Sequence, residues 1–430
     1  MKVAIVGGGL AGIAAAHTLL ADPSVTEVHL LEAESGYGGR ASTDTTSIPN
    51  FAFDMGAQYI QDPTTNPLTQ IAKAMGFETI KEVDSAMLRV ERDGKWADVA
   101  PTDDEVQAVV KGIKASYKVA KTKPNVVVAA KPSFDTQVEM FGHATSPYGP
   151  FTESAETWQY LAADRAREVP GDGAENLFVK RGVGTLVAAY GQLLPGLYKA
   201  RYKAHFDTRV TSIAHSDSGV TLSYANGSVT VDACIVTVPV GVLGSGAITF
   251  EPALPAAYKN ALKALRLGSY KKLALNLRTA PAGIVPGTNY YLIETEPEGV
   301  WQYYRLPHAP MVLVAHAAGD FAAALDGMED KDVFALFKAN IEEAYSNGVY
   351  FTTSKAITNW SDDPSAGGAY SYTAFIGGGP DNPDTLKARN DLAAPLDKLH
   401  FAGEATDPDC YGTLQAAYFE GVRAAQAVLA

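Results

Sequence analysis

The sequence contains very little cysteine. Of its 430 residues only Cys234 and Cys410 carry a thiol, and they do not form a CxxC pair. A structural zinc site or a redox-active cysteine pair is therefore not indicated, and we expect no metal in the protein. So few thiols are compatible with a reducing compartment.

Long apolar runs are also missing. No stretch approaches the roughly 18 apolar residues that a membrane helix needs. The first residues lead straight into a glycine motif, without a charged leader and a cleavage site. We therefore expect a soluble, cytoplasmic protein with no membrane partner, although a leader removed before Met1 would leave no trace in the sequence.

Positive charge is scarce as well. Lys and Arg total 35 against 48 Asp and Glu, which gives a formal net charge of −13. Nucleic-acid binding normally needs a basic face, so no nucleic-acid partner is expected. The acidity could steer cationic ligands weakly, but solubility is its simpler explanation.

What the sequence does have is the pattern of a βαβ unit at its N-terminus. Residues 1–6 form a short apolar run ended by glycines, which is typical of a buried parallel strand. Residues 10–20 place small and apolar side chains at helical spacing. Residues 27–31 predict a second strand, which ends at Glu32.

Gly7, Gly9 and Gly12 fit the G-x-G-x-x-G pattern at the junction of the first strand and the helix. In this context Gly7 makes the tight turn, Gly9 lets the backbone approach a pyrophosphate, and Gly12 lets helix and strand pack closely. The helix start offers free N–H groups to phosphates. Glu32 can accept hydrogen bonds from ribose hydroxyls and would repel a 2′-phosphate. The pattern therefore predicts a dinucleotide site that does not take NADP.

The rest of the chain contains two further groups of strands. Short β-branched runs between 205 and 239 predict a β-meander with a hairpin at Asn226-Gly227 and a last strand at 234–238. Residues 76–175 predict a separate, largely helical insertion. The other predicted elements are strands at 270–277, 290–293, 300–304, 311–315 and 399–402 and helices at 330–346 and 412–429.

Several segments resemble the flavin amine oxidase superfamily, which includes polyamine oxidases, monoamine oxidases and histone lysine demethylases. They span the chain and read Gly38-Gly39-Arg40, Phe53-Asp54-Met55-Gly56-Ala57, Val236-Thr237-Val238-Pro239-Val240-Gly241-Val242-Leu243, Gly268-Ser269-Tyr270-Lys271-Lys272 and Phe401-Ala402-Gly403-Glu404. The resemblance implies an α/β fold in which a Rossmann-type FAD-binding domain (1–75, 176–258 and 392–430) is interleaved with a mixed-sheet plus helical substrate domain (76–175 and 259–391).

The resemblance also implies how FAD is held. Arg40 would pair with pyrophosphate or flavin-side acceptors, and the backbone of Val210 would contact the adenine. Glu404 would accept from the ribityl chain. Monoamine oxidases carry a cysteine that bonds covalently to FAD, and Ala369 matches it here, so we expect non-covalent FAD. The implied FAD-binding residues are Gly7, Gly9, Gly12, Glu32, Gly39, Arg40, Gly56, Ala57, Val210, Trp360, Gly403, Glu404, Thr413 and Leu414.

Three residues are implied for the amine side of the site. Strand alternation places Lys271 and Lys272 on opposite faces without choosing between them, and the family register makes Lys272 the lysine that holds a water against flavin N5. Two adjacent lysines are otherwise typical of a solvated strand end. Tyr370 matches one wall of an aromatic cage, and Thr413 stands where monoamine oxidases have the second tyrosine. Gln61 replaces the Glu or His of several polyamine oxidases, and the insertion offers further pocket candidates in Tyr148, Glu153, Glu156 and Trp158.

The family reaction moves a hydride from the α-carbon of an unprotonated amine to flavin N5, and O2 then yields hydrogen peroxide. The resemblance therefore implies an amine oxidase whose rate rises at basic pH. The alternatives are an L-amino-acid oxidase, which would need an arginine for the substrate carboxylate, and a non-catalytic FAD-binding module that recognises a protein. An NAD-dependent dehydrogenase would leave the second half of the chain unexplained. The substrate and the oligomeric state are not indicated.

Overall fold

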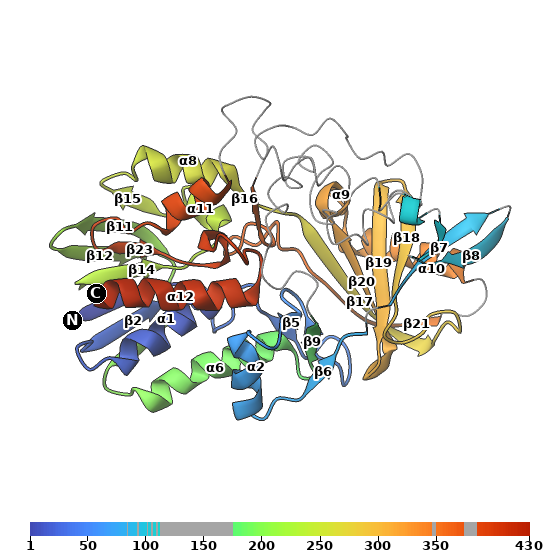
Figure 1. Cartoon of the computed structure of the whole chain (residues 1–430), viewed down its shortest axis with the longest axis horizontal. Coiled ribbons are helices and arrows are strands. Elements are labelled where there is room, and N and C mark those ends of the chain that lie inside the picture. The colour runs from blue at the N-terminus through green and yellow to red at the C-terminus, as the bar shows by residue number, and fades with distance from the viewer. Residues whose placement is uncertain are drawn as a thin grey trace.

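The structure is a computed structural model that describes residues 1–83, 85–92, 94–100, 102–104, 106–108, 111, 175–345, 350–373 and 385–430. Figure 1 shows a parallel sheet with its helices at the left and a larger sheet at the right. The α/β fold with a Rossmann-type unit is therefore confirmed, while the exact domain boundaries stay a prediction. No helix in the described ranges is long and apolar enough to cross a membrane.

The parallel sheet has five strands in the order β10-β2-β1-β14-β23. They are β1 (Lys2–Val6), β2 (Glu27–Leu31), β10 (Tyr202–His205), β14 (Ala233–Val236) and β23 (Leu399–Phe401). Val3 and Ile5 pack on the side of α1 (Leu10–Ala21), while Ala4 and Val6 pack on the side of the meander. Both faces of the sheet are thus covered, as parallel strands require.

The predicted hairpin is present in the meander. Strands β12 (Gly219–Tyr224) and β13 (Gly227–Val231) pair antiparallel, with Tyr224 opposite Gly227, and β11 (Val210–Ser216) continues the sheet. The prediction that residues 234–238 form the last strand of the meander is wrong, because this segment belongs to the parallel sheet as β14. β14 pairs with β1 and β23 in the parallel sheet, because all four of its residues are apolar and buried. The fourth place is taken by β15 (Thr249–Glu251).

The second sheet has seven strands in the order β21-β17-β20-β19-β18-β7-β8. One face packs on α9 (Gly319–Asp326) and α10 (Asp330–Ala344) through residues such as Leu273 and Leu275. The other face, which carries Ala274 and Val314, turns toward Phe53 of the first part. The strands are β7 (Ala86–Arg92), β8 (Lys95–Val99), β17 (Tyr270–Thr279), β18 (Asn289–Thr295), β19 (Glu298–Leu306), β20 (Ala309–Ala318) and β21 (Tyr350–Ile357).

The prediction of a largely helical insertion is wrong for residues 79–99, where the structure describes three strands. β6 (Thr79–Lys81), β7 and β8 are strands, and β7 lies parallel to β18. The reason is a period of two, in which buried Leu88 and Val90 alternate with Arg89 and Glu91. The candidates Tyr148, Glu153, Glu156 and Trp158 lie outside the described residues.

The remaining elements connect and cover these sheets. α12 (Leu414–Leu429) packs so closely on α1 that a Cβ on Gly421 would lie 2.1 Å from the carbonyl oxygen of Ala11. The others are β3 (Thr43–Asp44), β4 (Phe53–Asp54), β5 (Tyr59–Gln61), α2 (Pro67–Ala74), β9 (Asn176–Val179), α6 (Val183–Leu197), α7 (Val240–Gly244), α8 (Ala256–Ala264), β16 (Leu265–Leu267), β22 (Ser371–Thr373), α11 (Thr385–Ala393) and the short 3₁₀ helix η1 (Glu404–Thr406).

Candidate active site

One cavity of ≈ 540 Å³ extends from the carboxyl ends of the parallel strands to the second sheet. Its wall contains every predicted site residue except Gly12, which lies directly beneath it. Residues up to about 400 positions apart in the sequence thus form one surface. The structure brings the predicted FAD side and the predicted amine side together.

The fingerprint turn has the close contacts that glycine permits. Gly7 has a φ of +112°, in the region that favours glycine. A Cβ on Gly12 would lie 2.0 Å from the carbonyl oxygen of Gly7, so no larger residue fits there. In contrast, a Cβ on Gly9 would find only the carbonyl oxygen of Gly38, 3.9 Å away. The backbone at Gly9 is therefore open to a ligand.

Glu32 lies at the end of β2 with its carboxylate turned back to the fingerprint turn. Its Oε2 accepts from the N–H of Gly8 at 2.5 Å, and its Oε1 accepts from the N–H of Glu34 at 2.8 Å. Burial raises the pKa of Glu32 above its ordinary value. The carboxylate is thus held in place on the cavity wall, where its remaining lone pairs can accept from a ribose.

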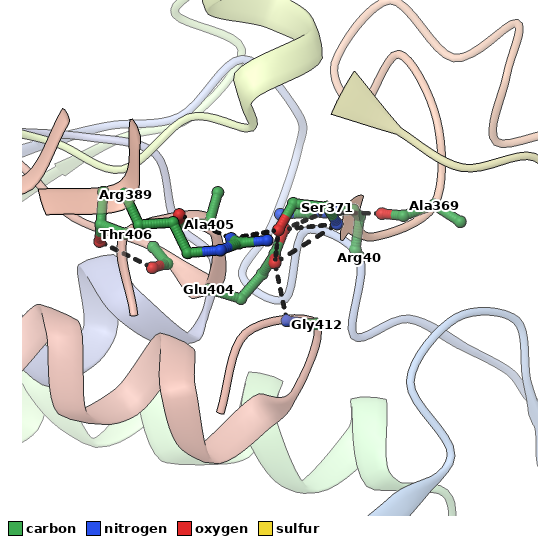
Figure 2. Close-up of polar contacts among 9 residues, drawn as sticks. Arg40, Ala369, Ser371, Arg389, Glu404, Ala405, Thr406 and Gly412 are labelled. Carbon is green, nitrogen blue, oxygen red and sulfur yellow. Dashed lines mark hydrogen bonds and ion pairs between the residues drawn. The ribbon is translucent and has the colours of Figure 1, made fainter. Parts of the chain in front are cut away.

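The partly buried Arg40 and the buried Glu404 form an ion pair (Figure 2), with Arg40 Nη1 2.9 Å from Glu404 Oε1 and 2.6 Å from the carbonyl oxygen of Ala369. Glu404 also accepts from the hydroxyl of Ser371 at 2.6 Å and from the N–H of Gly412 at 2.9 Å. Burial alone would raise the pKa of Glu404, but Arg40 and Ser371 outweigh it and hold that pKa below its ordinary value. The predicted contact of Arg40 with pyrophosphate stays a prediction.

Arg389 of α11 supports this ion pair and was not found from the sequence. Its side chain is 1% exposed, and Nη1 donates to Ser371 Oγ at 3.0 Å and to the carbonyl oxygen of Ala405 at 2.9 Å. Its guanidinium lies 3.5 Å from the centre of the Tyr411 ring, which lines the cavity. An arginine inside an otherwise ordinary helix carries no local signal for such a role.

Lys272 enters the cavity from β17. Its Nζ donates to the carbonyl oxygens of Asp54 and, at 3.1 Å, of Gly56. Burial lowers the pKa of Lys272 to about 8, and the nearby Asp54 opposes this shift. Burial likewise raises the pKa of Asp54 to about 6. The Asp54 carboxylate accepts from Thr43 Oγ1 at 2.6 Å and from the N–H of Val183 at 3.1 Å, so it caps α6.

Lys271 is also buried, so neither lysine is the solvated strand end that such a pair usually marks. It is 1% exposed and points to the opposite face of β17. There its Nζ lies 2.9 Å from Asp326 at the end of α9 and donates to Asn359 Oδ1 at 2.6 Å. Lys271 therefore fixes the segment next to Trp360 from behind.

Three predicted residues close the cavity near Lys272. The indole N–H of Trp360 donates to the carbonyl oxygen of Met55 at 3.0 Å, and the rings of Tyr370 and Tyr270 lie 6.2 Å apart. Thr413 is the N-cap of α12, because its hydroxyl donates to the carbonyl oxygen of Cys410 and accepts from the N–H of Ala416. The Thr413 hydroxyl thus serves the helix start.

Sequence reasoning missed several polar side chains of this part of the wall. Gln58, Tyr59, Tyr270 and His316 line the cavity, and Gln61 does as well. Tyr270 lies within a segment that resembles the family, and Gln58 and Tyr59 directly follow another, but no motif gives them a role; His316 lies in an ordinary apolar strand. No cluster of His, Cys, Asp or Glu that could hold a metal occurs in the part of the chain that the structure describes.

The chain is similar to known proteins over nearly its whole length. A family model described as "Flavin containing amine oxidoreductase" matches residues 10–429. The chain belongs to this family. It is 27% identical to polyamine oxidase 4 of Oryza sativa subsp. japonica, over 99% of this chain and 88% of the relative. It is 26% identical to lysine-specific histone demethylase 1 homolog 2 of the same plant, of which it covers 57%.

Solved structures show the same fold. Cyclohexylamine oxidase from Brevibacterium oxydans IH-35A has a TM-score of 0.75 at 20% identity, with 99% of this chain and 98% of that chain covered. Putrescine oxidase bound to putrescine has a TM-score of 0.75 at 18% identity, with 100% and 99% covered. These structures confirm the predicted fold. The family match shows that the chain is an FAD-dependent amine oxidase, and it confirms the predicted family and cofactor.

The cavity of this flavin amine oxidase fits its cofactor. Gly403 has a φ of +147° and lines the cavity, and a Cβ built on it would meet no atom within 4 Å, so a bound group has room there. Ala369 offers no thiol for a covalent bond, and FAD is bound non-covalently. The residues that would hold it are those of the fingerprint turn, Glu32 and the segment around Glu404.

Proposed function

We propose that this flavin amine oxidase removes a hydride from the α-carbon of an unprotonated amine and gives an imine, which water converts to an aldehyde or ketone. When bound, FAD supplies the hydride acceptor at N5 and, with O2, the route to hydrogen peroxide. The observation that carries the proposal is that the dinucleotide turn, Lys272 and Tyr370 all line one cavity.

The chain's own residues bind and orient the amine. The Tyr370 and Tyr270 rings provide an apolar and aromatic surface that excludes water around the reacting carbon. Lys272 holds the Asp54–Gly56 segment through two carbonyl oxygens, and its nitrogen has one further position for a water, to which it donates when charged and from which it accepts when neutral. Because its pKa is lowered to about 8, Lys272 loses much of its charge in the alkaline range where the amine is also neutral.

The amino-acid oxidase alternative lacks its arginine in the described part of the wall. The two arginines that line the cavity there are Arg40 and Arg209. Arg40 pairs with Glu404, and Arg209 lies 3.5 Å from Glu34. A substrate carboxylate would have to compete with these partners. An amine without a carboxylate is the better fit, in line with the names of the relatives.

The test is an anaerobic titration of the purified holoenzyme. The visible flavin bands are recorded with spermidine, putrescine, cyclohexylamine, benzylamine and L-phenylalanine in turn. We expect at least one of the amines to bleach the bands and L-phenylalanine to leave them unchanged. Bleaching by L-phenylalanine alone would support the amino-acid oxidase, and bands that no amine bleaches would contradict the proposal.

A further inference from the structure

A chain of hydrogen bonds runs along the cavity wall beside Lys272. Gln58 Nε2 donates to Tyr304 Oη at 2.6 Å. Tyr304 Oη lies 3.2 Å from His316 Nε2, and His316 Nδ1 lies 2.8 Å from Tyr270 Oη. Tyr270, His316 and Gln58 line the cavity. The side chains come from β17, β19, β20 and the segment before β5, so only the folded protein brings them together.

His316 at the centre of this chain is a neutral imidazole. It is 3% exposed, and burial followed by the charge of Lys272 lowers its pKa well below the ordinary value. The groups that face it are Lys272 and Tyr270 from β17 and Tyr304 from β19. A neutral imidazole has one N–H donor and one acceptor nitrogen. One tyrosine must therefore donate to His316, and the other must accept from it.

The chemistry of the proposed reaction selects the direction. When hydride leaves the α-carbon, the nitrogen lone pair moves into the new C=N bond and positive charge develops on nitrogen. A hydroxyl that donated to that lone pair would oppose the step, whereas an acceptor for the amine N–H would stabilise the charge. Tyr270 Oη is free to accept from the amine only if its own O–H already donates a hydrogen bond to His316 Nδ1.

We propose that His316 is a positioning residue for the amine nitrogen. It accepts the Tyr270 hydroxyl proton at Nδ1 and donates from Nε2 to Tyr304, which leaves Tyr270 Oη turned to the cavity as an acceptor. Gln58 donates to the same Tyr304 oxygen and keeps it in place. Donation of its hydroxyl proton to His316 Nδ1 makes Tyr270 Oη a stronger acceptor, so the acceptor strength of Tyr270 depends on that one bond. The inference rests on the proposed function, because that reaction fixes the direction.

Two conservative substitutions separate the two nitrogens of His316. In H316N the amide lies near the place of Nδ1 and can still accept from Tyr270. In H316Q the amide reaches toward Nε2 and keeps Tyr304 but not Tyr270. The control is H308N, the same substitution at a histidine that does not line the cavity. The ring of His308 packs near that of Phe178, with 6.4 Å between the ring centres. H316F, which bonds to neither tyrosine, serves as the reference for a complete loss.

Two readouts are measured on each holoenzyme. The first is the limiting rate of anaerobic flavin reduction by the amine that reacts best with the wild type. The second is the Kd of tert-butylamine by calorimetry, since this amine has no α-hydrogen and cannot be oxidised. In H316Q and H316F we expect the reduction rate to fall roughly tenfold and the tert-butylamine Kd to rise roughly tenfold. In H316N and H308N both values should stay within about twofold of the wild type.

The pattern of the variants decides the inference. Wild-type values in H316Q would overturn it, and so would an equal loss in H316N and H316Q, because that would show a packing role. Loss of bound FAD in step with loss of rate would overturn it as well. If no amine bleaches the wild-type flavin, the proposed function fails, while the tert-butylamine Kd values of H316N and H316Q still test the hydrogen-bond chain.

Discussion

The cavity has two walls that are built in different ways. The nucleotide wall consists of the fingerprint turn, Glu32, Arg40 and Glu404, and its ionised groups are paired or hydrogen-bonded within the wall. The reactive wall consists of Gln58, Tyr270, Lys272, His316 and Tyr370, and apart from Lys272 it is uncharged. The residues of the nucleotide wall lie in short continuous motifs, while those of the reactive wall come together through the register of separate strands.

The register of β17 and β20 shows how strand pairing builds the reactive wall. Lys272 lies directly opposite His316, and two residues earlier Tyr270 lies opposite Ala318. Alternation then places Tyr270 and Lys272 on one face, next to the histidine. A shift of one residue would turn all of these side chains to the helical side. The reactive wall therefore depends on strand pairing, and the nucleotide wall depends on local backbone geometry.

The largest expected effect comes from breaking the nucleotide wall at Glu404. E404Q would leave the partly buried Arg40 and the buried Arg389 without their charged partner, and removal of one partner costs up to about 3–5 kcal/mol when the pair is fully buried. We expect this loss in the free energy of unfolding from urea titration, together with loss of bound FAD. An unchanged unfolding midpoint would show that the Arg40–Glu404 pair does not stabilise this wall.

A second test concerns the glycine turn of the same wall. G12A would place a Cβ 2.0 Å from the carbonyl oxygen of Gly7, and such overpacking costs about 2–3 kcal/mol. G36A is the matched control, because a Cβ there meets no atom within 4 Å. We expect G12A to lose flavin on gel filtration and G36A to keep it. Equal flavin content in both variants would contradict the close packing of helix and strand.

The contrast also explains how far the sequence could lead. The sequence alone could identify the residues of the fingerprint turn, Gly7, Gly9 and Gly12, since close backbone approach leaves glycine as the only choice. It could also identify Glu32, because a carboxylate at the end of the second strand suits the ribose hydroxyls. For Lys271 and Lys272 alternation could not decide, because both faces of β17 are buried, and only the family register chose Lys272. For these two lysines the local sequence pattern is therefore not enough, because the choice between them depends on the tertiary structure.

Long-range partners explain the errors and the omissions. β14 looks like a meander strand until β1 and β23, distant in sequence, take it into the parallel sheet. Residues 86–92 carry three charged and four apolar side chains, so their period of two is short and easily taken for a charged helix. His316 shows no signal at all, because its role depends on Tyr270 and Tyr304 across two strand pairings.

The reactive wall is tested by K272M, which keeps the length of the side chain and removes its charge. We expect the limiting rate of flavin reduction to fall roughly a hundredfold. In the wild type kcat/KM should rise with pH, because the neutral amine is the reactive form and Lys272 loses its charge near its pKa of about 8. A pH-independent kcat/KM between acid and alkaline pH would contradict the proposed reaction.

The same lysine predicts a direction for stability. Its folded pKa of about 8 lies below the ordinary 10.5, so its contribution is fully present above pH 10.5 and is lost as pH falls through 8. The difference in unfolding free energy between wild type and K272M should therefore shift in favour of the wild type as pH rises from 8 to 10.5. K271M, which removes the same type of side chain on the opposite face of β17, is the matched control.

The smallest effect is expected where the nucleotide wall meets solvent. Glu34 lies 3.5 Å from Arg209 and also accepts from Ser365 Oγ, but the two charged side chains are 58% and 41% exposed. Water and salt screen such a pair, which is worth at most about 1 kcal/mol. E34Q should therefore raise the rate of FAD dissociation only a few-fold, and 1 M salt should abolish the difference from the wild type. Because E34Q and E404Q are the same chemical change on one wall, the gap between their effects measures what burial adds to a charge. A dissociation rate in E34Q as high as in E404Q would mean that the exposed pair, and not the buried one, holds the cofactor.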